Sequence, residues 1–209
     1  EDGKPKYLPA DEYLSGNVRE KLRWAKQSAE LYPEDYGENV RALEAVQPVD
    51  LTASEISVRL GATWLPPETI EEFMFELFST PRYCQWNIHV HYAQYTGEWN
   101  VEGKSYDRSN VKAYNTYGTG RVNGYKIMEE TLNLRDVRIF DYIEDGNGRK
   151  TAALNKKETA IAQGKQELIK QAFADWIWSD PERREQLTKL YNEKFNSIRP
   201  REYDGSHLN

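Results

Sequence analysis

The sequence predicts an α+β fold that is mostly helical, with small antiparallel β-hairpins and a C-terminal helical hairpin. Two consecutive stretches of helical periodicity fill residues 155–203. Residues 86–101 alternate in polarity around a Thr96-Gly97 turn. Residues 137–154 do the same around Gly146-Asn147-Gly148, so each of these two stretches is expected to form a hairpin.

The first expected elements are two antiparallel helices within residues 17–47. Ser15 or Asn17 can cap the first helix by accepting a hydrogen bond from a free backbone amide. Tyr32-Pro33 ends that helix, and a second short helix is expected over 39–46.

Three further elements are expected before the second hairpin. Residues 54–60 alternate in polarity and predict a short strand. A helix is expected between Pro66-Pro67 and Thr80-Pro81, and another from about 121 to 132. The apolar face of the 67–79 helix comprises Ile70, Phe73, Met74, Leu77 and Phe78.

The C-terminal helical hairpin is predicted from two apolar stripes and the break between them. Asp180 can cap the second helix, and Pro181 suits its first position, where a missing N–H costs nothing. Arg199 is expected in its last turn, and Pro200 stops it. The first stripe is Ile161, Lys165, Leu168, Ala172 and Trp176, with Ile169, Phe173 and Ile177 beside it. The second is Leu187, Leu190, Tyr191, Lys194, Phe195 and Ile198.

The length of 209 residues suits one domain with a loosely attached arm. We expect an extended arm over 1–12, a single domain over 13–205 and the start of a linker over 206–209. The chain opens at Glu1 without a methionine and ends abruptly. We therefore expect it to be a fragment of a longer polypeptide.

The composition predicts a soluble globular protein, with 38% hydrophobic and 30% charged residues. No apolar run approaches the roughly 20 residues that a membrane-spanning helix needs, so no membrane contact is expected. The single Cys84 cannot form an internal disulfide, which favours a reducing compartment such as the cytoplasm.

The net charge of −6 is unevenly distributed along the chain. Residues 1–107 hold 10 basic and 19 acidic residues, whereas residues 108–209 hold 18 and 15. A protein that only grips nucleic acid is usually basic overall. The mildly basic second half still permits a local surface that contacts phosphates.

Familiar catalytic and metal signatures are not matched. Residues 97–105 resemble a phosphate-binding loop, but the spacing is one residue too long and no strand leads into a helix there. His89 and His91 share one face of a strand but lack a third metal ligand nearby. Cys84 has no neighbouring histidine in the sequence, so burial is expected rather than reactivity. We therefore expect no catalytic residue, no metal and no cofactor in this chain.

Residues 108–124 favour contact with a polyanion. Arg108, Lys112 and Arg121 supply positive charge, and Thr119 lies in a Gly-Thr-Gly turn just before a helix, where free amides can bind a phosphate. Asn123 closes this turn. Tyr114 and Tyr117 either stack on bases or cover the core. The alternative is an ordinary glycine-rich turn that caps a helix, with both tyrosines packed inward.

Five motifs occur in order along nearly the whole chain, from about residue 7 to 208. They are Tyr13 to Leu22 (YLSGNVREKL), Val58 to Pro66 (VRLGATWLP), Thr131 to Leu134 (TLNL), Tyr191 to Asn196 (YNEKFN) and Arg201 to Ser206 (REYDGS). Together they resemble a segment of very large proteins of bacteriophages and conjugative elements. Those proteins join an N6-adenine DNA methylase to a Snf-type superfamily II helicase.

This resemblance implies a place beside two enzymes. The segment would lie between the methylase part and the helicase motor, so its partners would be those neighbouring domains and DNA. The parent protein would use ATP, Mg²⁺ and S-adenosylmethionine. The methylase signature, the helicase phosphate loop and its acidic ATPase motif are absent here, so no catalytic residue of either enzyme can be placed on this chain.

Two hypotheses follow. In the first, the chain is a DNA-contacting accessory domain, in which Arg108, Lys112 and Arg121 neutralise phosphates and four further cations extend the track. Those four are Lys165, Arg183, Arg184 and Lys189. In the second, it is a structural spacer that docks onto its neighbours without touching nucleic acid. An exposed apolar patch around Trp176, Trp178 and Tyr203 would favour the spacer.

Overall fold

The computed structural model describes residues 7–144 and 150–203. The chain divides into two compact units, one of residues 1–56 with 185–209 and one of residues 57–184. The single domain expected over 13–205 stays a prediction. The first half of the expected arm, the Gly146-Asn147-Gly148 turn and the expected linker at 206–209 lie outside the described residues.

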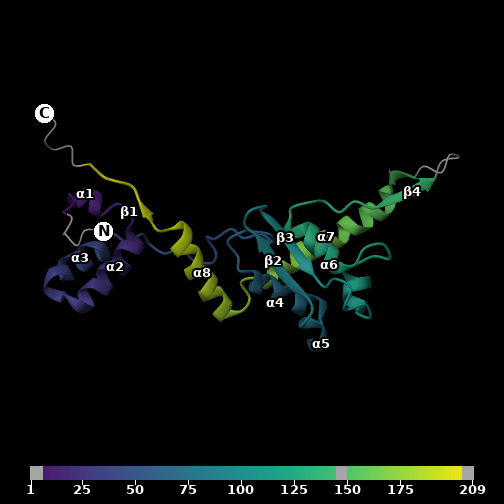
Figure 1. Cartoon of the computed structure of the whole chain (residues 1–209), viewed down its shortest axis with the longest axis horizontal. Coiled ribbons are helices and arrows are strands. Elements are labelled where there is room, and N and C mark those ends of the chain that lie inside the picture. The colour runs from purple at the N-terminus through teal and green to yellow at the C-terminus, as the bar shows by residue number, and fades with distance from the viewer. Residues whose placement is uncertain (1–6, 145–149, 204–209) are drawn as a thin grey trace. The chain divides into compact units, whose positions relative to one another are not determined.

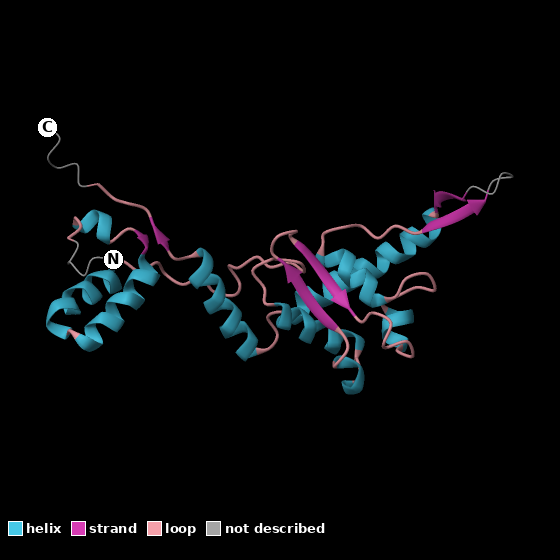
Figure 2. Cartoon of the chain, in the orientation of Figure 1, coloured by secondary structure: helices cyan, strands magenta, loops and turns pink. Residues whose placement is uncertain are grey.

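The α+β class is confirmed. Within the described ranges the chain is mostly helical, with three antiparallel sheets of two strands each (Figures 1 and 2). The antiparallel helical pair, both hairpins and the C-terminal helical region all form. The differences lie at element boundaries and in which side chains are buried.

The first unit is built on a short helical pair that is closed by a small sheet. Its elements are α1 (Ala10–Tyr13), β1 (Gly16–Asn17), α2 (Val18–Leu31), α3 (Pro33–Ala45), the greater part of α8 (Pro181–Phe195) and β6 (Ile198–Arg199). The side chain of Asn17 caps α2 by accepting a hydrogen bond from the Glu20 amide at 3.1 Å. Val18, Ala25 and Leu43 form the centre of its core.

Several boundaries in this unit differ from the expectation. Residues 10–12 belong to α1 instead of an extended arm. The second helix of the pair starts at Pro33, because proline at the first position needs no hydrogen-bond acceptor. Ile198 and Arg199 leave the last helix and pair with β1. That antiparallel pairing supplies the backbone hydrogen-bond partners of these residues in place of a further helical turn.

The strand expected at 54–60 is wrong, because this segment is irregular and no strand pairs with it. Ile56 and Leu60 are nevertheless buried. The start of the connection is held by a side chain instead of a strand: Asn192 accepts from the Leu51 amide at 2.8 Å and donates to the Leu51 carbonyl at 2.9 Å. The buried side-chain amide of Asn192 therefore satisfies the backbone just before the segment where the strand was expected.

The second unit places a hairpin on two helices and a long helix behind them. Its elements are α4 (Pro67–Phe78), α5 (Arg82–Gln85), β2 (His89–Ala93), β3 (Glu98–Glu102), the π-helical turn η1 (Lys112–Thr116), α6 (Gly124–Leu132), β4 (Phe140–Glu144), β5 (Lys150–Leu154), α7 (Lys156–Trp176) and the first turn of α8. β2 packs on α4, β3 packs on α6, and α7 packs against both helices (Figure 2).

The hairpin of β2 and β3 buries one face. Val90 pairs with Val101, and Tyr92 pairs with Trp99, whose rings are 4.8 Å apart. Gly97 makes the turn with a positive φ of 69°, a conformation that glycine adopts without steric cost. The alternation read from the sequence is thus confirmed for this hairpin.

The buried face of α7 differs from the predicted stripe. Ile161 and Leu168 are exposed. The buried positions are Thr159, Ala162, Gln166, Ile169, Phe173 and Ile177. Two of these are polar because their side chains form hydrogen bonds with the backbone of residues 135–139. Gln166 accepts from the Val137 amide at 3.2 Å and donates to the Arg135 carbonyl at 2.7 Å, and Thr159 accepts from the Ile139 amide at 3.0 Å.

A pair of glycine substitutions tests the packing of this unit. Gly61 has a φ of +90°, and a Cβ there would lie 2.2 Å from the Leu132 carbonyl oxygen. Gly61→Ala is therefore expected to lower the free energy of unfolding by about 2 kcal/mol. Gly164→Ala, in open space on α7, is expected to raise it by about 0.5–1 kcal/mol. Urea unfolding checks both changes, and effects of the same sign would contradict the described packing.

Candidate nucleic-acid interface

Tyr114 and Tyr117 pack inward. Both side chains are half-buried. The ring of Tyr117 lies 5.8 Å from that of Phe78, and the hydroxyl of Tyr114 accepts a hydrogen bond from the Asn123 side chain at 3.3 Å. These contacts match the alternative in which the tyrosines cover the core.

Side chains of the glycine-rich turn accept hydrogen bonds from backbone amides of the turn itself and of the helix that follows. The Thr119 hydroxyl accepts from the amides of Arg121 at 3.1 Å and Val122 at 3.2 Å, and Asn123 caps α6 by accepting from the Lys126 amide at 2.9 Å. The amides of Arg121, Val122 and Lys126 are therefore already bonded within the turn and the cap. Thr119 and Asn123 act as turn and cap residues.

Three of the predicted cations also have partners inside the fold. Arg121 pairs with Asp141 at 2.8 Å, and hydrogen bonding from Arg121 lowers the pKa of Asp141. Lys165 donates to the carbonyls of Asn115 at 3.2 Å and Thr116 at 2.9 Å, which end η1.

Arg183 is the most enclosed cation of the predicted set. Its side chain is 10% exposed, lies over the Trp176 ring at 3.4 Å and pairs with Glu72 at 3.4 Å. A guanidinium held in this way contributes to the packing of the fold, so its geometry gives no support to the phosphate contact expected at Arg183. Arg184 is exposed at the end of the second unit, and Lys189 is exposed in the first unit.

Arg108 and Lys112 are exposed, and the structure places them beside residues that sequence analysis missed. Arg82, Tyr83 and Trp86 are exposed on and just after α5, Tyr106 is exposed in the loop that follows β3, and Lys112 is bonded to Ser79, three residues before Arg82. Tyr83, Tyr106 and Arg108 line one open hollow together with Ser105 and Ser109. We call this set the aromatic–basic corner: Arg82, Tyr83, Trp86, Tyr106, Arg108 and Lys112.

At this corner, hydrogen bonds join the 105–112 loop to the end of α4, which lies about thirty residues earlier in the sequence. Asn110 donates to the Phe78 carbonyl at the end of α4 at 2.9 Å, and Lys112 donates to the Ser79 hydroxyl at 2.8 Å. The Cys84 sulfur lies 3.9 Å from the Tyr106 carbonyl oxygen. The 105–112 loop therefore runs along the junction of α4 and α5, and its exposed side chains stand on a fixed backbone.

The buried carboxylate of Asp107 forms hydrogen bonds beneath the exposed residues of the corner. Asp107 is 1% exposed and accepts from the Tyr125 hydroxyl at 2.8 Å and from the Asn110 side-chain amide. Burial raises the pKa of Tyr125, which keeps its hydroxyl protonated as a donor. Thr80 completes the chain of hydrogen bonds, 2.7 Å from the same hydroxyl.

Cys84 is buried beneath the corner, as expected. Burial and, next, the Asp107 charge raise the pKa of its thiol. The thiol is therefore a neutral packing group and not a nucleophile.

The corner carries positive charge that the described chain does not neutralise. In residues 7–144 and 150–203, Arg82, Arg108 and Lys112 form no ion pair with an acidic side chain. Elsewhere in the second unit Arg121 and Arg135 do, with Asp141 and Glu98. Three cations that have no acidic partner in the described residues lie on the segments that also carry the exposed rings, and in a chain of net charge −6 this favours an anionic ligand at this place.

A family model described as a domain of unknown function (DUF8437) matches residues 59–197. The chain belongs to this family. The DUF8437 match includes the whole aromatic–basic corner, and it begins after the helical pair of the first unit. Comparison with curated proteins and with solved structures gave no match.

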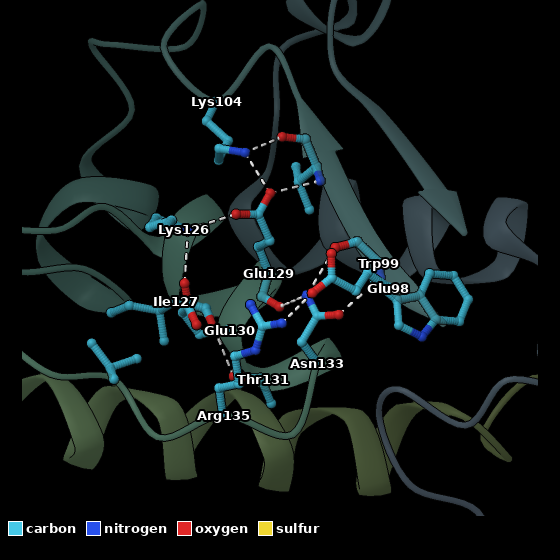
Figure 3. A network of polar contacts seen from close by, with 12 residues as sticks. Glu98, Trp99, Lys104, Lys126, Ile127, Glu129, Glu130, Thr131, Asn133 and Arg135 are labelled. Carbon is cyan, nitrogen blue, oxygen red and sulfur yellow. Dashed lines mark hydrogen bonds and ion pairs between the residues drawn. The ribbon is translucent and has the colours of Figure 1, made fainter. Parts of the chain in front are cut away.

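A second polar network in the DUF8437 domain closes the edge of the hairpin (Figure 3). Glu129 on α6 accepts from the Val101 amide at 2.9 Å, from Lys126 at 2.7 Å and from Lys104. Burial raises the pKa of Glu129, but the hydrogen bonds from Lys104, Lys126 and the Val101 amide outweigh it, so the net pKa is lowered.

Asn133 and Glu71 complete the protection of this hairpin. Asn133 accepts from the Trp99 amide and donates to the Trp99 carbonyl, each at 2.8 Å, as a neighbouring strand would (Figure 3). On the other edge Glu71 of α4 accepts from the Val90 amide at 2.9 Å. These side chains cover strand edges that would otherwise pair with another chain, so we assign the network a structural role.

Candidate metal ligands do not gather in the DUF8437 domain. His89 lies 3.5 Å from Glu71, and His91 lies 3.6 Å from Glu102. Among the described residues no three His, Cys, Asp or Glu side chains are grouped to hold a metal ion. None of the described helices is long and apolar enough to cross a lipid bilayer.

Proposed function

We propose that this chain is a non-catalytic accessory domain that contacts the DNA backbone within a larger DNA-processing protein. The observation that carries the proposal is the aromatic–basic corner, where Arg82, Arg108 and Lys112 lack acidic partners in the described chain. Lysine and arginine bind phosphates whatever the base sequence, so the contact would be independent of sequence.

The resemblance of the five motifs supports the proposed setting. The parent would join a Snf-type helicase to an adenine DNA methylase in the cytoplasm, with ATP, Mg²⁺ and S-adenosylmethionine bound by the neighbouring domains. In this chain the corner residues would hold DNA for those enzymes and would carry out no chemical step.

The second candidate function is a spacer that docks onto the neighbouring domains. Of the apolar patch expected around Trp176, Trp178 and Tyr203, the two tryptophans are half-buried in the second unit, where Trp176 donates to Glu76 at 2.7 Å, and Tyr203 is exposed in the first unit. The hairpin of β4 and β5 favours the spacer, since Tyr142 and Ile143 are exposed there (Figure 1). The two functions are compatible, because the corner and this hairpin use different residues.

A salt-dependent titration tests the proposed DNA contact. The triple variant Arg82→Ala/Arg108→Ala/Lys112→Ala is expected to reduce the slope of log affinity against log salt by about 0.9 per lost duplex phosphate contact. A matched triple variant, Arg23→Ala/Lys26→Ala/Arg41→Ala, removes equal charge from exposed positions on α2 and α3 and is expected to keep the slope.

The single variant Arg121→Ala separates the corner from the wider set of predicted cations. Because Arg121 pairs with Asp141, it is expected to leave the slope unchanged. Equal loss in both triple variants would show that net charge and not the corner drives binding. Absence of binding at low salt would leave the spacer as the better function.

A further inference from the structure

We propose that the aromatic–basic corner binds single-stranded nucleic acid by stacking unpaired bases on Tyr83, Trp86 and Tyr106. This inference rests on the proposed nucleic-acid contact and specifies its ligand. It assigns the recognition to three rings that lie outside the 108–124 segment.

The first support is the exposure of the rings. Tyr83 is 71% exposed, Trp86 82% and Tyr106 62%, although the domain buries comparable rings such as Tyr125 and Trp99. Tyr83 and Trp86 are three residues apart across the single turn of α5, a spacing that places side chains on one face. Tyr106 comes from a different loop but lines the same hollow as Tyr83.

The second support is the fixed base beneath the rings. Cys84, between the two α5 rings, is buried and contacts the Tyr106 carbonyl, and the following residue, Asp107, is buried and hydrogen-bonded. The backbones of both ring-bearing segments are thus held in place before any ligand arrives. Binding on such a platform costs little conformational entropy.

The third support is the charge beside the rings. Arg108 lines the same hollow as Tyr83 and Tyr106, and its guanidinium donates to the Ser105 carbonyl at 3.1 Å. A cation next to a ring can bind the phosphate that follows a stacked base. Alternating rings and cations are the arrangement by which single strands are held without sequence preference.

The choice of single strands over duplex follows from the exposed rings. In a duplex the base faces are already stacked on one another, so the rings would gain no stacking partner. Unpaired bases of either DNA or RNA present their faces, and every base has one. A surface that bound only duplex phosphates would gain nothing from three exposed rings.

Fluorescence anisotropy of the 209-residue chain with labelled oligo(dT), oligo(U) and a duplex of equal length tests the inference. We expect oligo(dT) or oligo(U) to bind more tightly than the duplex, and comparison of the two distinguishes DNA from RNA. Tyr83→Ala, Trp86→Ala and Tyr106→Ala are each expected to weaken single-strand binding about 5- to 150-fold. Tyr106→Phe keeps the ring and is expected to keep the affinity.

Two exposed tyrosines elsewhere provide matched controls. Tyr95→Ala, in the turn between β2 and β3, and Tyr142→Ala, on β4, remove equally exposed rings and are expected to leave the affinity unchanged. The urea midpoint of every variant confirms that the fold is retained.

The outcomes separate this inference from the function on which it rests. Charge-dependent binding that the ring variants do not weaken, or equal affinity for duplex and single strands, would leave the proposed DNA contact standing and overturn base stacking. No binding of any probe at low salt would overturn both.

Discussion

Asp107→Ala is expected to lower the free energy of unfolding by about 3 kcal/mol and to loosen the aromatic–basic corner. The carboxylate is buried and accepts hydrogen bonds from Tyr125 and Asn110, so its removal takes away two charge-assisted hydrogen bonds and leaves a cavity. Asn110 also anchors the loop to the Phe78 carbonyl, so this anchor should weaken too.

The single cysteine makes this change directly measurable. Cys84 is buried beneath the corner, so a thiol reagent labels it only when the region opens. Asp107→Ala is expected to raise the labelling rate by at least about tenfold in native buffer, which corresponds to about 1.4 kcal/mol of local opening. Asp107→Asn keeps one acceptor oxygen and should have a smaller effect. An unchanged labelling rate in Asp107→Ala would show that Asp107 does not stabilise the 105–112 loop against local opening.

Glu129→Ala is expected to lower the free energy of unfolding by about 3 kcal/mol. Its carboxylate is 11% exposed and satisfies the buried Val101 amide as well as two lysines (Figure 3). Removing it leaves that amide without its acceptor in the described structure, which costs more than the loss of a surface ion pair. Glu130→Ala is the matched control, because Glu130 is more exposed and its ion pair with Lys126 is worth at most about 1 kcal/mol.

The pH dependence of stability provides a second measurement for Glu129. Its pKa is lowered below the ordinary 4.5, so the folded chain binds this proton less readily than the unfolded chain. The stabilisation is therefore complete above pH 4.5 and is lost as the pH falls through the lower folded pKa. Glu129→Ala should show a smaller loss of stability than the wild-type chain over that acid range. A parallel loss in both would argue against the assigned role of Glu129.

Amphipathic helices with a purely apolar inner face were predicted well. The face of α4, with Ile70, Phe73, Met74 and Phe78, is buried as its spacing indicates. The stripe of α7 was predicted in part: Ile169, Phe173 and Ile177 are buried as expected, whereas Ile161 and Leu168 are exposed and Thr159 and Gln166 hold buried positions in their place. A periodicity of apolar residues cannot reveal a helix face on which polar side chains satisfy a neighbouring backbone.

The candidate interface was predicted only in part. The charge of Arg108 and Lys112 was visible in the sequence, and both remain exposed. Tyr83, Trp86 and Tyr106 were missed, because the β2–β3 hairpin separates α5 from the 105–112 loop along the chain. The clustering of aromatic residues with arginine in these two short segments was the signal that could have indicated them.

The sequence by itself determined several helix starts and the tight turn of the first hairpin, since a cap or a turn acts within a few residues of the chain. The Asn155 cap of α7, the Asp180 cap with Pro181 of α8 and the Gly97 turn are examples. Only the tertiary structure decided which polar groups act inside the fold and which face solvent. Gln166 meets the Arg135 carbonyl and Arg121 meets Asp141 because packing brings distant segments together, whereas Arg108 and Lys112 form no ion pair with an acidic side chain of the described residues. That difference is a property of three-dimensional contact and cannot be read from the order of residues along the chain.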